Sequence, residues 1–327
     1  MHSDIFGETG RVGVGGAELA LMTMAEAWTK AGHEVVLFND PRRGQGSSPF
    51  EQRDVESFQA GEKRDFLIIF RSPNAKVYRV ESPKIWWSCD QYTVGDFRHF
   101  AQFAQKIVTI SPFHTDHFKA AYGIEDAISI DLPVRSWEYE SIEKVPNRLI
   151  FTSVPHRGLE IALKNFPRIK SEVPDASLVV TSDYRLWGQT SPLNAEFVQQ
   201  AMSIEGVQFL GGVPRARLVK EQLKAQIHFY PCTYDELFCI AVAESQIAGT
   251  LPITSDRGAL VTTNMGVLIA GNPADQRCQD VFVETVVKYL LSDYLAEVQL
   301  EVQKRAFERF SIDVILKEWD DKVFNAI

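Results

Sequence analysis

Long apolar runs are missing from this sequence, and no stretch approaches the roughly 18 consecutive apolar residues that a membrane-spanning helix needs. The first residues, Met1 to Asp4, carry neither the basic start nor the apolar stretch of a secretory signal peptide. Cysteine is scarce, and the four cysteines are Cys89, Cys232, Cys239 and Cys278. They include no C-x-x-C pair, which argues against a disulfide framework and a structural zinc site. We therefore expect a protein of the reducing cytoplasm.

Positive charge is also in deficit. Lysine and arginine total 34 against 43 aspartates and glutamates, and the net charge is −9. An acidic chain is a poor partner for a phosphate backbone, so we expect no binding to nucleic acid. Apolar material is plentiful, at 45% of the 327 residues. At roughly 150 residues per domain, this length predicts about two domains, each with its own packed core.

Short apolar runs rich in β-branched and aromatic residues alternate with amphipathic stretches along the chain. The runs predicted as buried strands are 34–38, 66–70, 84–88, 106–110, 127–130, 148–152, 177–181, 207–210, 227–230 and 251–254. Helices are predicted over 17–31 and 158–173, and from 273 onward. This alternation is typical of α/β proteins with parallel sheets. The polar segment 132–146 contains two prolines and predicts a linker, which gives domains over 1–147 and 148–310.

Two glutamates follow the predicted strand 227–230. The sequence predicts a helix that begins near Leu237 and ends at Gly249, so Glu236 and Glu244 would lie eight rises apart, or roughly 12 Å. Carboxylates at that spacing could bind two ends of one extended ligand. The free N–H groups of the first turn, near Phe238, Cys239 and Ile240, favour an anion such as a diphosphate between them. The plainer interpretation is that Glu236 compensates the helix dipole and Glu244 is solvated.

The segment YPCTYDELFCIAVAES (230–245), followed by AGTLP (248–252), closely resembles the signature of retaining glycosyltransferases of the GT-B fold, in the large family 4 grouping. The resemblance implies that Glu236 contacts hydroxyls of the donor sugar and that Glu244 holds the nucleotide ribose. It also implies that the backbone amides of Phe238, Cys239 and Ile240 bind the diphosphate.

Other motifs in the second half carry the same resemblance. Arg157, directly before Gly158, occupies the place of a basic residue that pairs with the donor diphosphate, and a guanidinium suits phosphate oxygens. Relatives commonly have a second basic residue where this chain has Thr152. The plainer role for Arg157 is a surface salt bridge. The stretch FLGGVP (209–214), with Gly212 and Val213, resembles the loop that surrounds the nucleobase, although an ordinary strand-to-helix loop is a plausible alternative.

The first half carries weaker signals. The stretch VGVGGAE (12–18), with Gly15 and Gly16, resembles the family's N-terminal glycine loop, where backbone N–H groups can approach a phosphate. Its plainer interpretation is a tight turn. Only Ile5 and Phe6 precede these glycines, so the first strand is expected to be very short or to begin upstream. The stretch WWSCDQ (86–91) places Cys89 where relatives often have histidine, next to Asp90.

The resemblance thus implies an α/β protein of the GT-B fold, with two Rossmann-like domains facing each other across a cleft and a C-terminal helix, 311–327, that crosses back to the first domain. The implied activity is retaining transfer from a nucleoside-diphosphate sugar, with UDP-sugar as the first guess. The expected catalytic residues are Glu236, Arg157 and Asp90, with no cofactor and no metal. The acceptor is expected to be a carbohydrate or a lipid-linked hydroxyl compound, and peripheral membrane contact is compatible with this reading. The alternatives are nucleotide-sugar binding with little or no turnover and, less favoured, sugar-nucleotide epimerisation.

Overall fold

The computed structural model describes residues 15–39, 48–72, 75–90, 97–184 and 193–327. The chain divides into two compact units, Ala17–Pro133 with Phe310–Ile327, and Val134–Arg309. The division after Pro133 lies earlier than the predicted boundary after 147. Residues 134–147 join the second unit because Lys144 Nζ donates to the carbonyl oxygens of Leu223 and Ala225, at 3.1 and 2.7 Å.

The second unit is built on a six-stranded parallel sheet with the order β12-β11-β10-β7-β8-β9. Its strands are β7 (Arg148–Thr152), β8 (Ser177–Thr181), β9 (Val207–Phe209), β10 (Ile227–Tyr230), β11 (Leu251–Ser255) and β12 (Val267–Ile269). Counted from β7, this is the 3-2-1-4-5-6 order of the doubly wound Rossmann fold. The chain runs outward from the centre in one direction and then in the other, so β7 and β10 mark the topological switch point.

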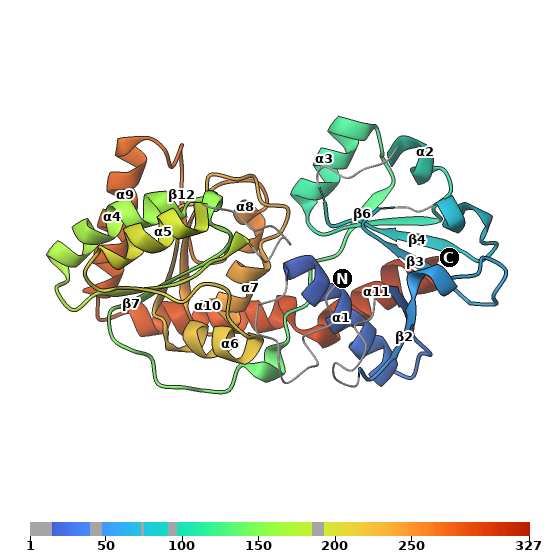
Figure 1. Ribbon diagram of the computed structural model, residues 1–327, viewed down its shortest axis with the longest axis horizontal. Helices are drawn as coiled ribbons and strands as arrows, with labels where there is room; N and C mark the ends of the chain where they lie inside the picture. The colour runs from blue at the N-terminus through green and yellow to red at the C-terminus, as the bar shows by residue number, and fades with distance from the viewer. Residues whose placement is uncertain (1–14, 40–47, 73–74, 91–96, 185–192) are drawn as a thin grey trace. The chain divides into compact units, whose positions relative to one another are not determined.

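Helices cover both faces of this sheet. They are α4 (Leu159–Glu172), α5 (Leu193–Met202), α6 (Arg215–Lys224), α7 (Ile240–Ile247), α8 (Leu260–Thr263), α9 (Gln276–Leu290) and α10 (Leu295–Phe310). Figure 1 shows α4, α5 and α9 on one side of the sheet and α6, α7 and α10 on the other. Apolar residues of β7, β8 and β10 are fully buried between these layers, as their largely apolar sequences predict.

The first unit contains a four-stranded parallel sheet, β3-β4-β5-β6, and a separate parallel pair, β1-β2. Its strands are β1 (Val36–Asn39), β2 (Glu51–Asp54), β3 (Leu67–Phe70), β4 (Lys84–Trp87), β5 (Lys106–Thr109) and β6 (Ala127–Ser129). The helices of this unit are α1 (Gly16–Lys30), α2 (Phe97–Ala101), α3 (Pro112–Tyr122) and α11 (Ile312–Lys322). The predicted first strand near Ile5 and Phe6 lies outside the residues that the structure describes.

Two consecutive tryptophans in β4 anchor the two faces of this sheet. Successive strand residues point to opposite faces. Trp86 therefore contacts Phe97 of α2, with ring centroids 4.9 Å apart, whereas Trp87 contacts Trp319 of α11 at 5.2 Å. Trp28 of α1 packs edge-on against Trp319, also at 5.2 Å. The prediction that the C-terminal helix returns to the first unit is confirmed, and Trp319 is its apolar anchor.

Candidate functional site

The predicted residues Arg157 and Glu236 lie in the loops that leave β7 and β10. These neighbouring strands form the switch point of the second sheet. The chain leaves β7 toward one edge of the sheet and β10 toward the other, so the two loops separate at the carboxyl ends of the strands. In open α/β sheets, ligands bind in the crevice at this position.

Gly158 allows the two loops to approach each other closely. Its φ angle is +113°, and a β-carbon at this position would come within 2.2 Å of the Pro231 carbonyl oxygen. Gly258 has the corresponding role on the far side of Glu236, because a β-carbon there would meet the Glu236 carbonyl oxygen at 2.4 Å. Glycine at both positions therefore allows the close backbone packing that surrounds the Arg157 and Glu236 side chains.

The Arg157 guanidinium and the Glu236 carboxylate form an ion pair. Arg157 Nη1 donates to Glu236 Oε1 at 2.8 Å and to Oε2 at 2.9 Å. Glu236 is buried, whereas the Arg157 side chain is 21% exposed. Burial acts to lower the pKa of Arg157, but the Glu236 carboxylate, together with weaker contributions from Tyr230, Cys239 and Cys232, outweighs it, so the pKa is raised and the charge is secure. Arg157 thus does form a salt bridge, as its plainer role required, but the partner is a residue of the candidate site, Glu236.

Two tyrosines that the sequence analysis did not single out support this pair. The buried Tyr230 hydroxyl donates to Glu236 Oε1 at 2.6 Å and also lies 3.1 Å from Ser153 Oγ. The Arg157 guanidinium lies 4.5 Å from the Tyr234 ring centroid, a cation–π contact. Tyr230 is the last residue of β10. Its position at the carboxyl end of a predicted strand is the sequence signal that could have identified it as a site residue.

The helix after Glu236 begins later than predicted. α7 starts at Ile240, not near Leu237, so Glu236 precedes the helix and the estimate of eight helical rises to Glu244 is wrong. The reason is Cys239, which caps the helix in the left-handed conformation at φ 69° and separates the loop from the first turn. A left-handed residue next to helical ones gathers successive backbone N–H groups into an anion-binding concavity. The predicted amide positions Phe238, Cys239 and Ile240 span this bend.

Glu244 lies one turn into α7 and is buried rather than solvated. Its Oε1 accepts from Arg215 Nη1 at 2.5 Å, and its Oε2 accepts from Gln222 Nε2 at 3.3 Å. Burial raises the pKa of Glu244, an effect that the Arg215 charge and the Gln222 hydrogen bond oppose. Both partners come from α6, and neither was predicted from the sequence.

The predicted nucleobase loop joins β9 to α6. Gly212 donates its backbone N–H to Asp183 Oδ2 at 3.4 Å, and Asp183 follows the end of β8. Gly212 and Val213 are both half-buried. The loop therefore lies at the carboxyl edge of the sheet, the same edge as Arg157 and Glu236.

In the first unit, Asp90 forms a cluster with Arg71 and Glu18. Arg71 Nε and Nη2 bind the two carboxylate oxygens of Asp90 at 2.6 and 2.7 Å, and Arg71 Nη1 donates to Glu18 Oε1 at 2.7 Å. Arg71 directly follows β3 and has a φ of 67°, which is strained for a residue other than glycine. Its position at the end of a predicted strand could have identified it.

Cys89 and His114 lie beside this cluster. Burial raises the pKa of the Cys89 thiol well above its usual value, so the thiol stays protonated. The Ile110 backbone N–H donates to His114 Nδ1 at 3.3 Å, which leaves the proton on Nε2. Nε2 then donates to the Asp90 carbonyl oxygen, also at 3.3 Å. His114 therefore supports the backbone at Asp90.

The glycine loop is only partly within the described residues. Gly16 is the first residue of α1 and Gly15 directly precedes it, whereas 12–14 lie outside. Across the residues with described positions, no group of three or more His, Cys, Asp and Glu side chains is arranged to hold a metal ion. Within the same residues, no helix is both long and apolar enough to span a membrane.

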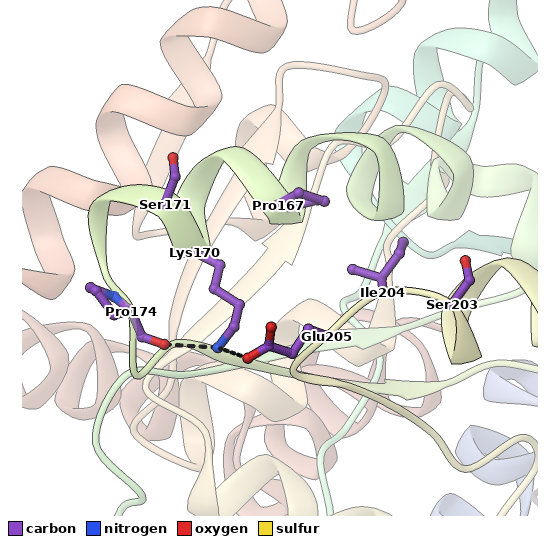
Figure 2. A pocket seen from close by; sticks show the side chains of 7 residues that line it. All are labelled: Pro167, Lys170, Ser171, Pro174, Ser203, Ile204 and Glu205. Atoms are coloured by element: carbon purple, nitrogen blue, oxygen red, sulfur yellow. Dashed lines mark hydrogen bonds and ion pairs between the residues drawn. The ribbon is translucent and has the colours of Figure 1, made fainter.

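A surface hollow of about 530 Å³ lies at the other end of the second sheet. It is lined by Pro167, Lys170, Ser171, Pro174, Ser203, Ile204 and Glu205 (Figure 2). These residues precede β8 and β9, so the hollow is at the amino edge of the strands and includes no predicted site residue. Lys170 Nζ donates to the Pro174 carbonyl at 2.7 Å and lies 3.7 Å from Glu205, so its charge is already compensated.

Comparison with known proteins agrees with this architecture. Residues 147–305 match the family described as glycosyl transferases group 1. Sucrose-phosphate synthase of Thermosynechococcus elongatus is similar in structure, with a TM-score of 0.76 and 13% identity, covering 100% of this chain and 98% of that one. HepE of Anabaena, solved in complex with UDP and glucose, has a TM-score of 0.71 and 14% identity, covering 96% of this chain and 100% of that one.

A curated relative matches by sequence over a shorter stretch. Phosphatidyl-myo-inositol mannosyltransferase of Mycobacterium tuberculosis is 24% identical over 168 residues, which cover 50% of this chain and 42% of the relative. The chain thus matches less than half the length of that protein. Taken together, the fold is the GT-B fold of glycosyltransferases. More narrowly, residues 147–305, which carry Arg157, Glu236 and Glu244, belong to glycosyl transferases group 1.

Proposed function

We propose that the second unit binds a nucleoside-diphosphate sugar at the carboxyl ends of β7 and β10, and that the protein transfers the sugar to a hydroxyl acceptor with retention of anomeric configuration. The observation that carries this proposal is the ion pair of the partly exposed Arg157 with the buried Glu236, 2.8 Å apart, beside the left-handed bend at Cys239. A cation, a carboxylate and the backbone amides at the start of α7 suit the charged and hydroxylated ends of such a donor.

Arg157 and the start of α7 would stabilise the leaving group. The bond from the anomeric carbon to the diphosphate breaks, and negative charge develops on the departing phosphate oxygen. A partly exposed guanidinium held by Glu236 and the Tyr234 ring needs little reorganisation to meet that charge. The helix dipole and the amides near Cys239 add to the effect.

Glu236 would orient the sugar rather than attack it. Its oxygens already accept three hydrogen bonds from Arg157 and Tyr230, which fixes the carboxylate plane, and of its about four acceptor positions these bonds leave one, on Oε2, for a sugar hydroxyl. The acceptor oxygen forms its bond to the anomeric carbon on the face that the diphosphate leaves. The departing phosphate takes the acceptor proton, so the step requires no protein nucleophile and no metal.

UDP is the first nucleotide to test, and a carbohydrate or lipid-linked hydroxyl compound is the proposed acceptor class. Asp90, held by Arg71, is the proposed polar contact on the acceptor side. Binding of UDP, GDP, ADP and their sugars by calorimetry tests the donor site. Transfer and donor hydrolysis are then compared for the wild type, Glu236→Ala and the control Glu205→Ala, whose carboxylate lies at the opposite edge of the sheet.

We expect Glu236→Ala to lower turnover by about 100-fold or more, while Glu205→Ala behaves as the wild type. Equal rates for the wild type and Glu236→Ala would remove Glu236 from the mechanism. Failure of every nucleoside diphosphate to bind would overturn the proposal as a whole.

A second candidate function is donor binding without turnover, and Cys89 favours it. The raised pKa of this thiol keeps it neutral, so it cannot act like a histidine that titrates near neutral pH. This function would be supported if the unaltered chain binds the donor tightly but transfers sugar to none of a panel of acceptors, and if Cys89→His restores transfer. Transfer by the unaltered chain would exclude it.

A further inference from the structure

His156 is an exposed histidine beyond the carboxyl end of β7, and no step of the proposed reaction uses it. It lies between Pro155 and Arg157 in the short 3-10 helix that follows the strand. Its carbonyl oxygen accepts from Thr233 Oγ1 at 3.4 Å, so the loop after β10 holds its backbone. The imidazole is therefore accessible to solvent at the switch point of the sheet, next to the arginine that is proposed to meet the diphosphate.

The imidazole packs against the end of β8, whereas its neighbour Arg157 faces the loop after β10. The imidazole ring is nearly parallel to the ring of Tyr184, with an interplanar angle of 5° and centroids 5.8 Å apart. Burial raises the pKa of Tyr184, so its hydroxyl stays neutral. An aromatic ring within about 6 Å favours the cationic form of an imidazole. Arg157 contacts Glu236 and Tyr234, so the two basic side chains occupy neighbouring positions along the carboxyl edge of the sheet.

The proposed diphosphate position is short of positive charge. Arg157 Nη1 donates to both carboxylate oxygens of Glu236, so the charges of these two side chains sum to zero. Thr152, the last residue of β7, brings no charge. The flanking loops also carry Asp183, which is buried, and Asp235, which is exposed. A diphosphate would therefore gain from a further cation, and the His156 imidazole can become one by taking up a proton.

The free protein keeps His156 mostly neutral near pH 7. Partial burial lowers the pKa of this histidine, the Arg157 charge lowers it further, and the Glu236 carboxylate opposes both. A bound diphosphate would compensate the Arg157 charge and attract a proton to the imidazole, so the pKa of His156 should rise on binding. Binding that raises a pKa takes up a proton, and by linkage the affinity then increases as the pH falls.

We propose that His156 is a second phosphate-binding residue of the donor site: it takes up a proton when a nucleoside-diphosphate sugar binds and donates a hydrogen bond to the diphosphate beside Arg157. This inference rests on the proposed donor binding. It adds that the affinity for the donor depends on pH and that one imidazole is the cause. The proton comes from the solvent, and no covalent bond of the donor changes in this step.

The test measures the affinity of UDP-glucose, GDP-mannose and ADP-glucose for the full chain by calorimetry at about pH 5.5 and about pH 7.5. Sugar nucleotides are the required probes, because the terminal phosphate of a free nucleoside diphosphate itself titrates near about pH 6, whereas an esterified diphosphate does not. We expect the wild type to bind about tenfold more tightly at the lower pH, the value of one hydrogen bond between charged groups. Calorimetry at about pH 6.5 in two buffers of different ionisation enthalpy should show net proton uptake.

His156→Gln keeps a hydrogen-bonding side chain that cannot take up a charge. This variant should lose the proton uptake, and at both pH values it should bind with the affinity that the wild type has at about pH 7.5. His33→Gln is the matched control, because it removes an exposed histidine from the first unit. It should bind the sugar nucleotides with the same pH dependence as the wild type.

A wild type with the same affinity at both pH values overturns the inference while leaving donor binding intact. A pH dependence that persists in His156→Gln also overturns it, since another group would then titrate. If His156→Gln weakens binding equally at both pH values, the histidine is merely structural. Uridine has no phosphate and should show no pH dependence, so a dependence shared by uridine would mean that the imidazole contacts the nucleoside instead. If no sugar nucleotide binds at either pH, the proposed function itself fails.

Discussion

Gly158 lies so close to Pro231 that a β-carbon on Gly158 would come within 2.2 Å of the Pro231 carbonyl oxygen and 2.9 Å of its carbonyl carbon. Real β-carbons do not make contacts of this kind with rigid backbone. The carboxyl ends of β7 and β10 therefore meet only because residue 158 has no side chain. This contact places Arg157 against Glu236, so it connects the conformation of one residue to the geometry of the site.

Gly158→Ala should therefore destabilise the protein by more than backbone strain alone. Gly123→Ala is the matched control, because Gly123 also has a positive φ of 67° but has no atom within 4 Å of an added β-carbon. We expect about 1 kcal/mol of destabilisation at Gly123 and at least about 3 kcal/mol at Gly158, measured by urea unfolding. Equal losses at the two sites would show that the loops adjust freely.

The Arg157–Glu236 pair gives a prediction about coupling. Arg157→Met would leave the buried Glu236 carboxylate without its cation, and we expect a loss of about 3 kcal/mol in the free energy of unfolding. Adding Glu236→Gln removes the uncompensated charge, so the double variant should be more stable than Arg157→Met alone. A double-mutant cycle by urea unfolding measures this coupling. Additive effects would mean that the two side chains do not interact in solution.

The strands were predictable where their burial is complete. β7, β8 and β10 have the predicted bounds because each is a short run of mostly apolar residues with buried side chains. β2 was missed because its sequence, EQRD, has no apolar residue and its side chains are exposed or half-buried. β12 was also missed, although its sequence, VLI, is apolar.

The candidate site was predictable in its members but not in its pairings. Arg157 and Glu236 are 79 positions apart in the sequence, and nothing local indicates that they form an ion pair. The start of α7 was misplaced because Leu237 and Phe238 continue the apolar pattern, whereas the break depends on the φ angle of Cys239. Arg215 was overlooked because a charged residue at a helix start is usually solvated.

His114 gives a prediction for pH dependence. Burial lowers its pKa from 6.5 to about 3, so the folded protein keeps this histidine neutral while the unfolded chain takes up a proton below pH 6.5. The contribution of His114 to stability is therefore complete above pH 6.5 and is lost as the pH falls toward 3. The slope is about 1.4 kcal/mol per pH unit.

The measurement is the difference in unfolding free energy between the wild type and His114→Asn at two pH values. Between about pH 7.5 and pH 5 the advantage of the wild type should shrink by about 2 kcal/mol. His228, which is also buried, is present in both proteins, so its own titration cancels. A difference that does not change with pH would show that folding does not lower the pKa of His114.

Cys239 gives the last prediction, because its left-handed backbone sets the start of α7. The residue has a φ of 69°, and its side chain makes no capping hydrogen bond, so the thiol does not explain the conformation. Glycine adopts this conformation without the cost of about 1 kcal/mol that a β-carbon brings. Cys239→Gly should therefore be about 1 kcal/mol more stable than Cys239→Ala, the reverse of the usual order in a helix.

Cys239→Gly and Cys239→Ala both remove the sulfur. The difference in their stability therefore reports the cost of the left-handed backbone conformation rather than the loss of side-chain packing. Nucleoside diphosphate affinity should be retained in Cys239→Gly, because the amides near Ile240 keep their directions. Cys239→Val should lose both stability and affinity, since a β-branched residue resists the left-handed region. If alanine is instead the more stable replacement, the bend is not present in solution, and the anion-binding arrangement before α7 must be assigned differently.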